Sequence, residues 1–431
     1  MDNSQDKAAA RSENPSRAKP DRATIGSIAI RVFALLLMAV LIFHEETRFE
    51  SEKNCPGEEI PRSQLFSADY KLVTSFSSFH DPNDQLVRIV TLVGGTEPEE
   101  VLSSDVCVQR EFLAKLVRKL KLSGSSIIVI DKRFSDSTCA NQTKGTDDLI
   151  KAVAEGGSRV VIGLGTSFVP RSQWKTLGTR VTCMTADSTV KFKEAKLGLI
   201  RIDSDTRRVA LDWPVFADAK EPPKLMPTLA LLAAEEVNPN VTRRKRLASI
   251  LNSGKPPFSF FNPRNTFNKY SALALLCGTA ATPSTPWRNC TEAPDTLSTE
   301  LQGKIAVIGE YSSSDEHETV LGSMYGVDLQ ANYIAALLSD DVYIAVGDSL
   351  SNTLYATFWF LVVQGIFAFV RPLPRAAVFC GILWAAIFIT SVLLLTYWGR
   401  LITFWFQGLN LGIILLTWVE YWLHGMSVHH K

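Results

Sequence analysis

The sequence has no excess of charge of either sign. Its 431 residues include 45 lysine and arginine residues against 44 aspartate and glutamate residues, which gives a formal net charge of +1. A protein that binds nucleic acid or an acidic polymer usually carries a clear basic excess or a concentrated basic patch. The balance therefore gives no indication of such a partner, and no nucleic-acid binding is predicted.

The sequence also lacks the short motifs that mark common catalytic, nucleotide and metal sites. It has no CxxC pair and no HExxH, which argues against a zinc ribbon and a zinc protease. It has no GxxxxGK[ST] loop and no GxSxG elbow, and "GLGTSF" at Gly163 lacks the third glycine of a dinucleotide fingerprint. No catalytic residue, cofactor or metal site is therefore predicted, and an enzyme is the least favoured class of function.

Charged residues almost disappear from the C-terminal part of the chain. Residues 350–370 and 376–398 contain no charged side chain, and residues 401–423 contain only Glu420. Each stretch is long enough to cross about 30 Å of hydrocarbon as an α-helix, so we predict three transmembrane helices with these bounds. Three polar side chains interrupt them: Gln364, Gln407 and Asn410. We expect these residues to hold the helices together rather than to form an ion path.

An apolar segment near the N-terminus, residues 25–43, has two interpretations. It contains Arg31, and its uninterrupted apolar part is as short as that of a signal peptide. However, "HEETRFE" follows it without a small-residue cleavage site, and Arg31 is close enough to one end to reach the headgroups. We therefore predict an uncleaved transmembrane anchor, preceded by a poorly ordered cytoplasmic tail over residues 1–24.

Lysine and arginine residues set the expected orientation in the membrane. Several precede the first apolar segment, and Arg371 and Arg375 lie in the loop between the first two C-terminal spans. Short loops rich in these residues stay on the cytoplasmic side. We therefore predict a multi-pass protein of the bacterial inner membrane with both termini in the cytoplasm. Residues 45–349 would then form a large periplasmic domain.

The cysteines agree with an oxidising compartment for this domain. Six of the seven fall within residues 45–349, and the seventh, Cys380, lies in a predicted span. An even number of cysteines outside the cytoplasm predicts up to three disulfides. Their expected pairs are Cys277–Cys290, Cys55–Cys107 and Cys139–Cys183. The first pair flanks a short irregular loop, and the other two rest on proximity in sequence. Buried free thiols are the alternative.

Strand-like and helix-like patterns alternate through the predicted periplasmic domain. "LVRIVTLV" at residues 86–93 and "SIIVID" at residues 126–131 are short and almost fully apolar. "REFLAKLVRKLKL" at residues 110–122 instead repeats its apolar residues at helical spacing. Fully apolar strands that alternate with helices are typical of a parallel sheet buried on both faces. The sequence therefore predicts one α/β domain with a largely parallel sheet and helices on both faces.

Polar residues follow several of the expected strands. In open parallel sheets, ligands bind in the crevice beyond the carboxyl ends of the strands. The predicted ligand-binding residues are Asp131, Arg133, Thr166, Ser312, Asp315 and His317. Their hydroxyls and paired charges suit a small polar ligand. The alternative is that Asp131, Arg133 and Asp315 form an ion-pair cluster with a purely structural role.

The stretch "LQGKIAVIGEYSSSDEHETVLGSMYGVDLQANYIAALLSDD", Leu301–Asp341, resembles the closing motif of the second class of CHASE domains. These are extracellular sensory domains associated with cyclases and histidine kinases. The motif combines an apolar strand, an Asp–x–His loop and a helix start, which correspond here to Gly303–Gly309, Asp315–His317 and Gly326–Asn332. Weaker matches are "SIIVIDKRF", "LGLIRIDSDTRRVALDWPV" and "PPFSFFNP", in the family's order. The layout of one anchor, an outer domain and three membrane helices also resembles the family.

The resemblance implies a sensor that passes movement of its last helix into the membrane. Family receptors normally continue into a kinase or cyclase domain, whereas this sequence ends soon after the last predicted span, and its six outer cysteines depart from the family pattern. We therefore expect a membrane-anchored sensory subunit that acts through a separate membrane or cytoplasmic output protein, kinase-like or cyclase-like. A homo-oligomer also fits. The alternative is a structural subunit of a membrane complex that binds no small molecule.

Overall fold

The computed structural model describes residue 72 and residues 86–93, 106–134, 144–156, 159–177, 180–186, 192, 194–202, 211–217, 222–238, 257–259, 267–279, 281–282, 285–290, 298–319, 322–339, 342–346, 349–398, 400–402 and 407–429. The predicted tail (residues 1–24), the predicted N-terminal anchor (residues 25–43), Cys55 and Cys139 lie outside these residues.

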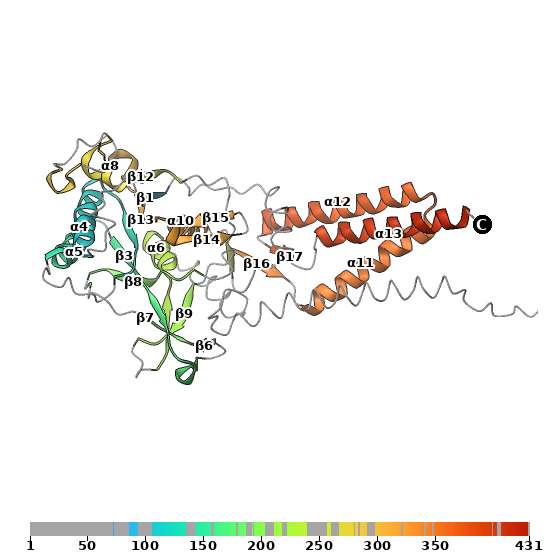
Figure 1. Cartoon of the computed structure of the whole chain (residues 1–431), viewed down its shortest axis with the longest axis horizontal. Helices are drawn as coiled ribbons and strands as arrows, with labels where there is room; N and C mark the ends of the chain where they lie inside the picture. Colours follow the sequence, from blue (N-terminus) through green and yellow to red (C-terminus); the bar gives the residue numbers. More distant parts are fainter. Residues whose placement is uncertain are drawn as a thin grey trace, which may run out of the picture.

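Six parallel strands form the central sheet, in the order β12–β1–β13–β2–β3–β8. Figure 1 shows the sheet on the left, away from the bundle of long helices. Their bounds are Lys269–Ser271 (β12), Val87–Val93 (β1), Ile305–Tyr311 (β13), Ile127–Asp131 (β2), Arg159–Leu164 (β3) and Lys196–Leu199 (β8). The central strands are almost continuously apolar and buried, as expected for parallel strands that are covered on both sides. The predicted α/β class with a large parallel sheet is confirmed.

Helices cover both faces of this sheet. They are α4 (Val106–Leu122), α5 (Lys144–Ala154), α6 (Leu229–Val237), α8 (Ala272–Cys277) and α10 (Gly326–Ser339). Helices α4, α5 and α8 share a core with alternate strand residues such as Val90 and Ile128. Helices α6 and α10 share a second core with the residues between them, such as Ile89 and Val129. The two cores follow from the two-residue period of a strand, which points neighbouring side chains to opposite faces.

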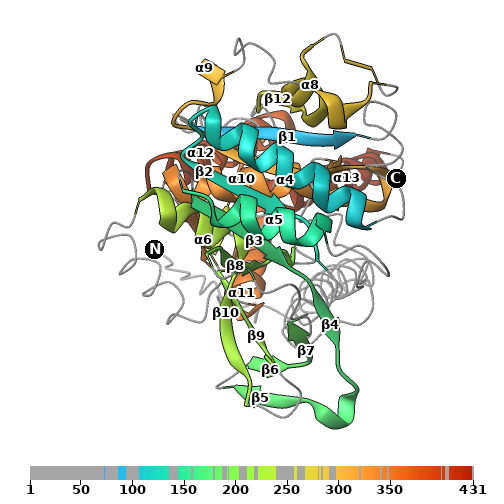
Figure 2. The ribbon, with the colours of Figure 1, turned by 90° about the vertical axis from the view of Figure 1, so that its left-hand side faces the viewer.

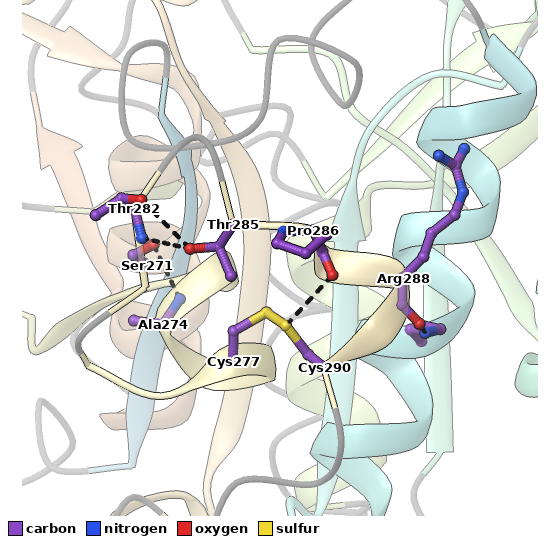
Figure 3. Close-up of a disulfide and its surroundings, with 9 residues drawn as sticks. Ser271, Ala274, Cys277, Thr282, Thr285, Pro286, Arg288 and Cys290 are labelled. Carbon is purple, nitrogen blue, oxygen red and sulfur yellow. Dashed lines mark hydrogen bonds between the residues drawn. A yellow bond between two sulfur atoms is a disulfide. The ribbon is translucent and has the colours of Figure 1, made fainter.

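A disulfide closes the loop that follows α8 (Figure 3). Cys277 ends α8 and Cys290 follows the 3₁₀ turn η2 (Trp287–Asn289), with 5.0 Å between the two Cα atoms. Trp287 is buried inside this loop, edge-on to Phe112 of α4 with 5.2 Å between the ring centroids. The predicted Cys277–Cys290 pair is therefore present, and it holds the loop over the core beneath α4.

Two further cysteines of the domain are also disulfide-bonded, Cys107 at the start of α4 and Cys183 between β6 and β7. Their predicted partners, Cys55 and Cys139, lie outside the described residues. The pairing of these four cysteines therefore stays a prediction.

Three antiparallel strand pairs form a lobe beside the central sheet, at the bottom of Figure 2. The pairs are β4 (Thr166–Phe168) with β7 (Met184–Ala186), β5 (Lys175–Leu177) with β6 (Arg180–Thr182), and β9 (Asp212–Val215) with β10 (Lys224–Pro227). A small core joins Cys183, Met184 and Val215 of the lobe to Leu164 of β3 and Leu199 of β8. No pattern in the sequence predicts this lobe. The predicted site residue Thr166 begins its first strand.

A small three-stranded sheet and a bundle of three long helices lie beyond the α/β domain (Figure 1). The elements are β11 (Pro257–Ser259), β16 (Val342–Val346), α11 (Ser349–Phe369), α12 (Leu373–Trp398), β17 (Arg400–Ile402) and α13 (Gln407–His429). Strand β16 pairs with β11 in antiparallel fashion and with β17 in parallel. Strand β17 lies in the connection between α12 and α13, so that connection is tied to the strand that leads into α11.

Two of these helices, α11 and α12, are long and apolar enough to cross a membrane. They nearly coincide with the first two predicted C-terminal spans, residues 350–370 and 376–398. The segment of the third predicted span, residues 401–423, differs at its start. Residues 400–402 are extended because they pair with β16, and the helix begins only at Gln407.

Polar side chains join the three helices. Gln364 Nε2 on α11 donates a hydrogen bond to a threonine hydroxyl of α13 at 3.2 Å. Gln407 Nε2 on α13 donates to Ser391 Oγ on α12 at 3.1 Å, and Asn410 Nδ2 donates to a tyrosine hydroxyl of α11 at 2.9 Å. The predicted role of these residues in holding the helices together is confirmed.

Candidate functional site

The carboxyl ends of β2 and β13 lie side by side, and α10 begins directly over them. Asp131, the last residue of β2, is paired with Gly309 of β13. A Cβ atom on Gly309 would lie 2.6 Å from Val327 Cβ in the first turn of α10 and 3.6 Å from Asp131 Cβ. The missing side chain at Gly309 therefore allows α10 to approach the sheet closely beside Asp131.

The turn after β13 places a second carboxylate at the start of α10. Asp315 ends the 3₁₀ turn η3 (Ser313–Asp315), and its backbone N–H donates to the Ser312 carbonyl oxygen at 3.0 Å. Its carboxylate oxygens lie 2.6 and 2.7 Å from the position that a Cβ atom would take on Gly326, the first residue of α10. The N–H groups and the dipole at a helix N-terminus favour a negative charge in this place.

Negative charge is concentrated around Asp131. Burial of its carboxyl group raises the pKa of Asp131 well above its ordinary value, and the carboxylates of Asp315 and Glu310 raise it further. Lys132, the next residue along, forms an ion pair with Glu310. Asp131 and Asp315 therefore repel each other whenever both are ionised.

A second polar cluster joins the first turn of α10 to strands β12 and β13. Tyr311 donates its hydroxyl hydrogen bond to Asp328 Oδ2, and Lys269 Nζ lies 3.0 Å from Asp328 Oδ1. Lys269 Nζ also lies 4.5 Å from the centre of the Tyr311 ring, and the Tyr311 and Tyr325 ring centroids are 3.8 Å apart. Burial, followed by the hydrogen bond to Asp328, raises the pKa of the Tyr311 hydroxyl.

The residues of this second cluster were not among the predicted site residues. One signal in the sequence points to Asp328. An acidic residue two positions after Gly326 falls in the first turn of the helix, where the helix dipole stabilises its negative charge. Nothing local points to Lys269, because it reaches Asp328 only through the order of strands in the sheet.

The structure brings three of the predicted residues together at the start of α10. Asp131 and Asp315 interact electrostatically, and His317 Nε2 on β14 (Glu316–Thr319) lies 3.7 Å from Asp315 Oδ1. Ser312 takes part through its backbone carbonyl oxygen. A hairpin of β14 and β15 (Gly322–Tyr325) carries the chain from this turn to α10.

Two predicted residues lie at the end of the neighbouring strand β3. The Arg133 side chain covers Gly165, where a Cβ atom would lie 2.6 Å from Arg133 Cδ. Thr166 follows Gly165 and is paired with Ala186 in the antiparallel lobe. The predicted set therefore spans two parts of the sheet edge, an acidic part under α10 and a part beside the lobe.

The arrangement under α10 is suited to accepting protons or hydrogen bonds. Its carboxylates are acceptors when ionised, and each becomes a donor when it is protonated. Among the described residues, no group of three or more His, Cys, Asp and Glu side chains is arranged to hold a metal ion.

Comparison with known proteins gives one match. A family model described as the CHASE2 domain matches residues 59–365. The matched span contains both polar clusters at the start of α10 and extends into α11. No curated protein and no solved structure matches the chain.

Proposed function

The chain belongs to the CHASE2 domain family of extracellular sensory domains, and we propose that it is a membrane-anchored sensory subunit that signals through a separate output protein. One observation carries the proposal: the helix that begins at Gly326, beside Asp131 and Asp315, leads through β16 into α11. A stimulus that favours one position of α10 over another shifts the population between them. The start of α11 then moves together with α10.

The orientation that we propose puts residues 45–349 in the periplasm and both termini in the cytoplasm. The pairing of β16 with β17 supports it, because the connection between α12 and α13 lies at the same end of the bundle as the α/β domain. Arg371 and Arg375 then lie at the opposite end, where positively charged loops face the cytoplasm. Residues 25–43 and α13 complete the four proposed spans of a bacterial inner-membrane protein.

The proposed ligand site combines the two parts of the sheet edge. Its residues are Asp131, Arg133, Thr166, Ser312, Asp315 and His317. Carboxylates predominate under α10, which favours a small polar stimulus that brings positive charge or hydrogen-bond donors to that part. Arg133, beside Gly165, supplies the complementary charge for the other part.

The output protein is proposed to bind the membrane helices or the cytoplasmic ends of this chain. Large apolar side chains are exposed on the bundle, among them Phe358, Ile382 and Leu416. Such surfaces face lipid or the helices of another membrane protein. A kinase-like or cyclase-like partner, or a second copy of this chain, can occupy part of this surface.

Two variants, Arg133→Ala and Asp315→Ala, test the signalling role. The full chain is purified in mild detergent with its output protein, and phosphoryl transfer or cyclic-nucleotide formation is measured. Each variant is expected to melt close to the wild-type temperature and to change the output. Asp147→Ala is the matched control, because Asp147 is exposed in the first turn of α5. Unchanged output from well-folded variants would place the site elsewhere. A stable complex with no enzymatic output would favour the structural-subunit alternative.

A fusion experiment tests the orientation separately. A reporter that is active only in the cytoplasm, joined after Lys431, is expected to be active. The same reporter inserted between α12 and α13 is expected to be silent. The reverse pattern, with normal expression of both fusions, would overturn the proposed topology.

A further inference from the structure

The acidic cluster under α10 is packed closely against the first turn of the helix. A Cβ atom on Gly309 would lie 2.6 Å from Val327, and one on Gly326 would lie 2.6 Å from Asp315. There is therefore no space for an extra carbon atom between Gly309 and Val327, or between Gly326 and Asp315. Repulsion between carboxylates in this place is relieved by movement of α10 or of the turn that carries Asp315.

The charged and titratable groups around Asp131 come from four elements and the turns that join them. They are Lys132 and Arg133 after β2, Glu310 and Tyr311 on β13, Asp315 and His317 on η3 and β14, and Asp328 on α10. Lys132 is held by Glu310, and Lys269 of β12 is held by Asp328 and Tyr311. The carboxylates of Asp315 and Glu310 both disfavour ionisation of Asp131.

We propose that the proton is the stimulus of this site: Asp131 is protonated while α10 is packed on the sheet, and loss of that proton loosens the first turn of α10. The inference rests on the proposed sensory function and names its stimulus. A neutral carboxyl group on Asp131, beside Gly309, does not repel the Asp315 carboxylate. An ionised one places like charges side by side beneath a helix that leads to the membrane.

The direction of the pH effect follows from linkage. The pKa of Asp131 is higher in the packed state than in an open state that exposes the side chain, so the packed state binds the proton more tightly. The stabilisation from this group is fully present below the open-state pKa of about 4. It is lost as the pH rises through the higher, packed-state pKa. Acidification of the outer compartment therefore tightens α10, and neutralisation loosens it.

Amide hydrogen exchange on the full-length protein in mild detergent tests the inference. The informative amides are those of residues 330–333, whose intrahelical hydrogen bonds close the first turn of α10. Protection factors, corrected for the intrinsic effect of pH, are measured between pH 4.5 and pH 8. In the wild-type protein they are expected to fall as the pH rises, by at most about tenfold per pH unit, which is the limit for one proton.

Three variants separate the Asp131 proton from other titrations. Asp131→Asn mimics the neutral acid and is expected to keep the low-pH protection up to pH 8. Asp315→Asn removes one repelling charge and is expected to narrow the pH interval over which protection falls, so the inference remains testable if Asp131→Asn folds poorly. Asp147→Asn, on the exposed first turn of α5, is expected to behave like the wild-type protein.

Flat protection in the wild-type protein, or the same pH dependence in Asp131→Asn as in the wild type, overturns the proton inference. This readout needs no output protein, so its failure is distinguishable from failure of the signalling proposal. If α10 responds to pH and the partner's output does not, the proton inference stands and the signalling proposal fails.

Discussion

Ala345 and Leu401 lie opposite each other on the parallel strands β16 and β17, although α11 and α12 separate them in the chain. Strand β16 is also paired, on its other edge, with β11. The strand that leads into α11 is therefore held on one side by β11, which precedes the central-sheet strand β12 in the chain, and on the other by the connection between α12 and α13. A displacement of β16 reaches the ends of all three helices rather than α11 alone.

This pairing predicts a specific cross-link. Neighbouring strands lie about 4.8 Å apart, which is within the Cα separation that a disulfide bridges. Cysteines introduced by Ala345→Cys and Leu401→Cys are expected to join on mild oxidation, as detected by peptide mapping without reduction. The control combines Ile344→Cys with Leu401→Cys, because successive strand residues point to opposite faces. Equal cross-linking of the two pairs, or none in either, would disprove the register.

The hydrogen bond from Tyr311 to Asp328 predicts a measurable stability loss. Tyr311→Phe leaves a partly buried carboxylate without this donor, which is expected to lower the free energy of unfolding by about 1–3 kcal/mol. Tyr325→Phe is the control, because it keeps the ring contact with Tyr311 and removes a hydroxyl that makes no hydrogen bond to the described residues. Denaturant melts of the two variants in mild detergent give the comparison. Equal stability would mean that the hydroxyl contributes little.

The main features of the fold are predictable because they depend on short-range patterns. Residues 86–93 and 126–131 are expected strands, and β1 and β2 occupy them almost to the residue. The predicted helix over residues 110–122 exists as α4, which begins earlier, at Val106. In these segments the spacing of the apolar residues indicates the structure. A short continuous apolar run is buried as a strand, and apolar residues at helical spacing are buried on one face of a helix.

The antiparallel lobe and β17 are not predictable in the same way. Their strands are as short as three residues, too short for alternation to show, and they form by pairing with distant segments. The residues "LMP" of β10 pair with β9, and the next helix, α6, begins only at Leu229, where Thr228 caps it by accepting the Leu231 N–H at 3.4 Å. Propensity over such short stretches gives way to tertiary pairing.

The candidate site was predictable only in part. Asp131 and Asp315 follow strands, so the rule for parallel sheets placed them at one edge, where the structure has them. Lys269 and Asp328 meet because β12 and β13 flank β1 in the sheet. No local sequence pattern predicts that order of strands. The close approach at Gly309 was likewise invisible, because it depends on where α10 lies above the sheet.

Removal of the Cys277–Cys290 disulfide is expected to lower the stability of the domain. The bond closes a loop with a sequence separation of 13, which the chain-entropy model values at about 3 kcal/mol. Cys277→Ser combined with Cys290→Ser is therefore expected to lower the melting temperature and to expose the buried Trp287, seen as a red shift of its fluorescence. Cys277→Ala combined with Cys290→Ala is expected to match it, because both pairs remove the same bond. A double variant that melts like the wild type would show that packing alone holds the loop.

The Gly309→Ala variant tests what happens when α10 is forced away from the sheet. The new Cβ atom would lie 2.6 Å from both Cβ and Cγ2 of Val327, so the first turn of α10 must move or the core must distort. Overpacking of this kind is expected to cost about 1–3 kcal/mol of stability. Gly156→Ala is the control, because a Cβ atom there meets nothing within 4 Å. If displacement of α10 is the signal, Gly309→Ala also changes the output of the partner protein in the absence of any stimulus, while Gly156→Ala leaves it unchanged. Normal output from a destabilised Gly309→Ala variant would show that α10 does not carry the signal.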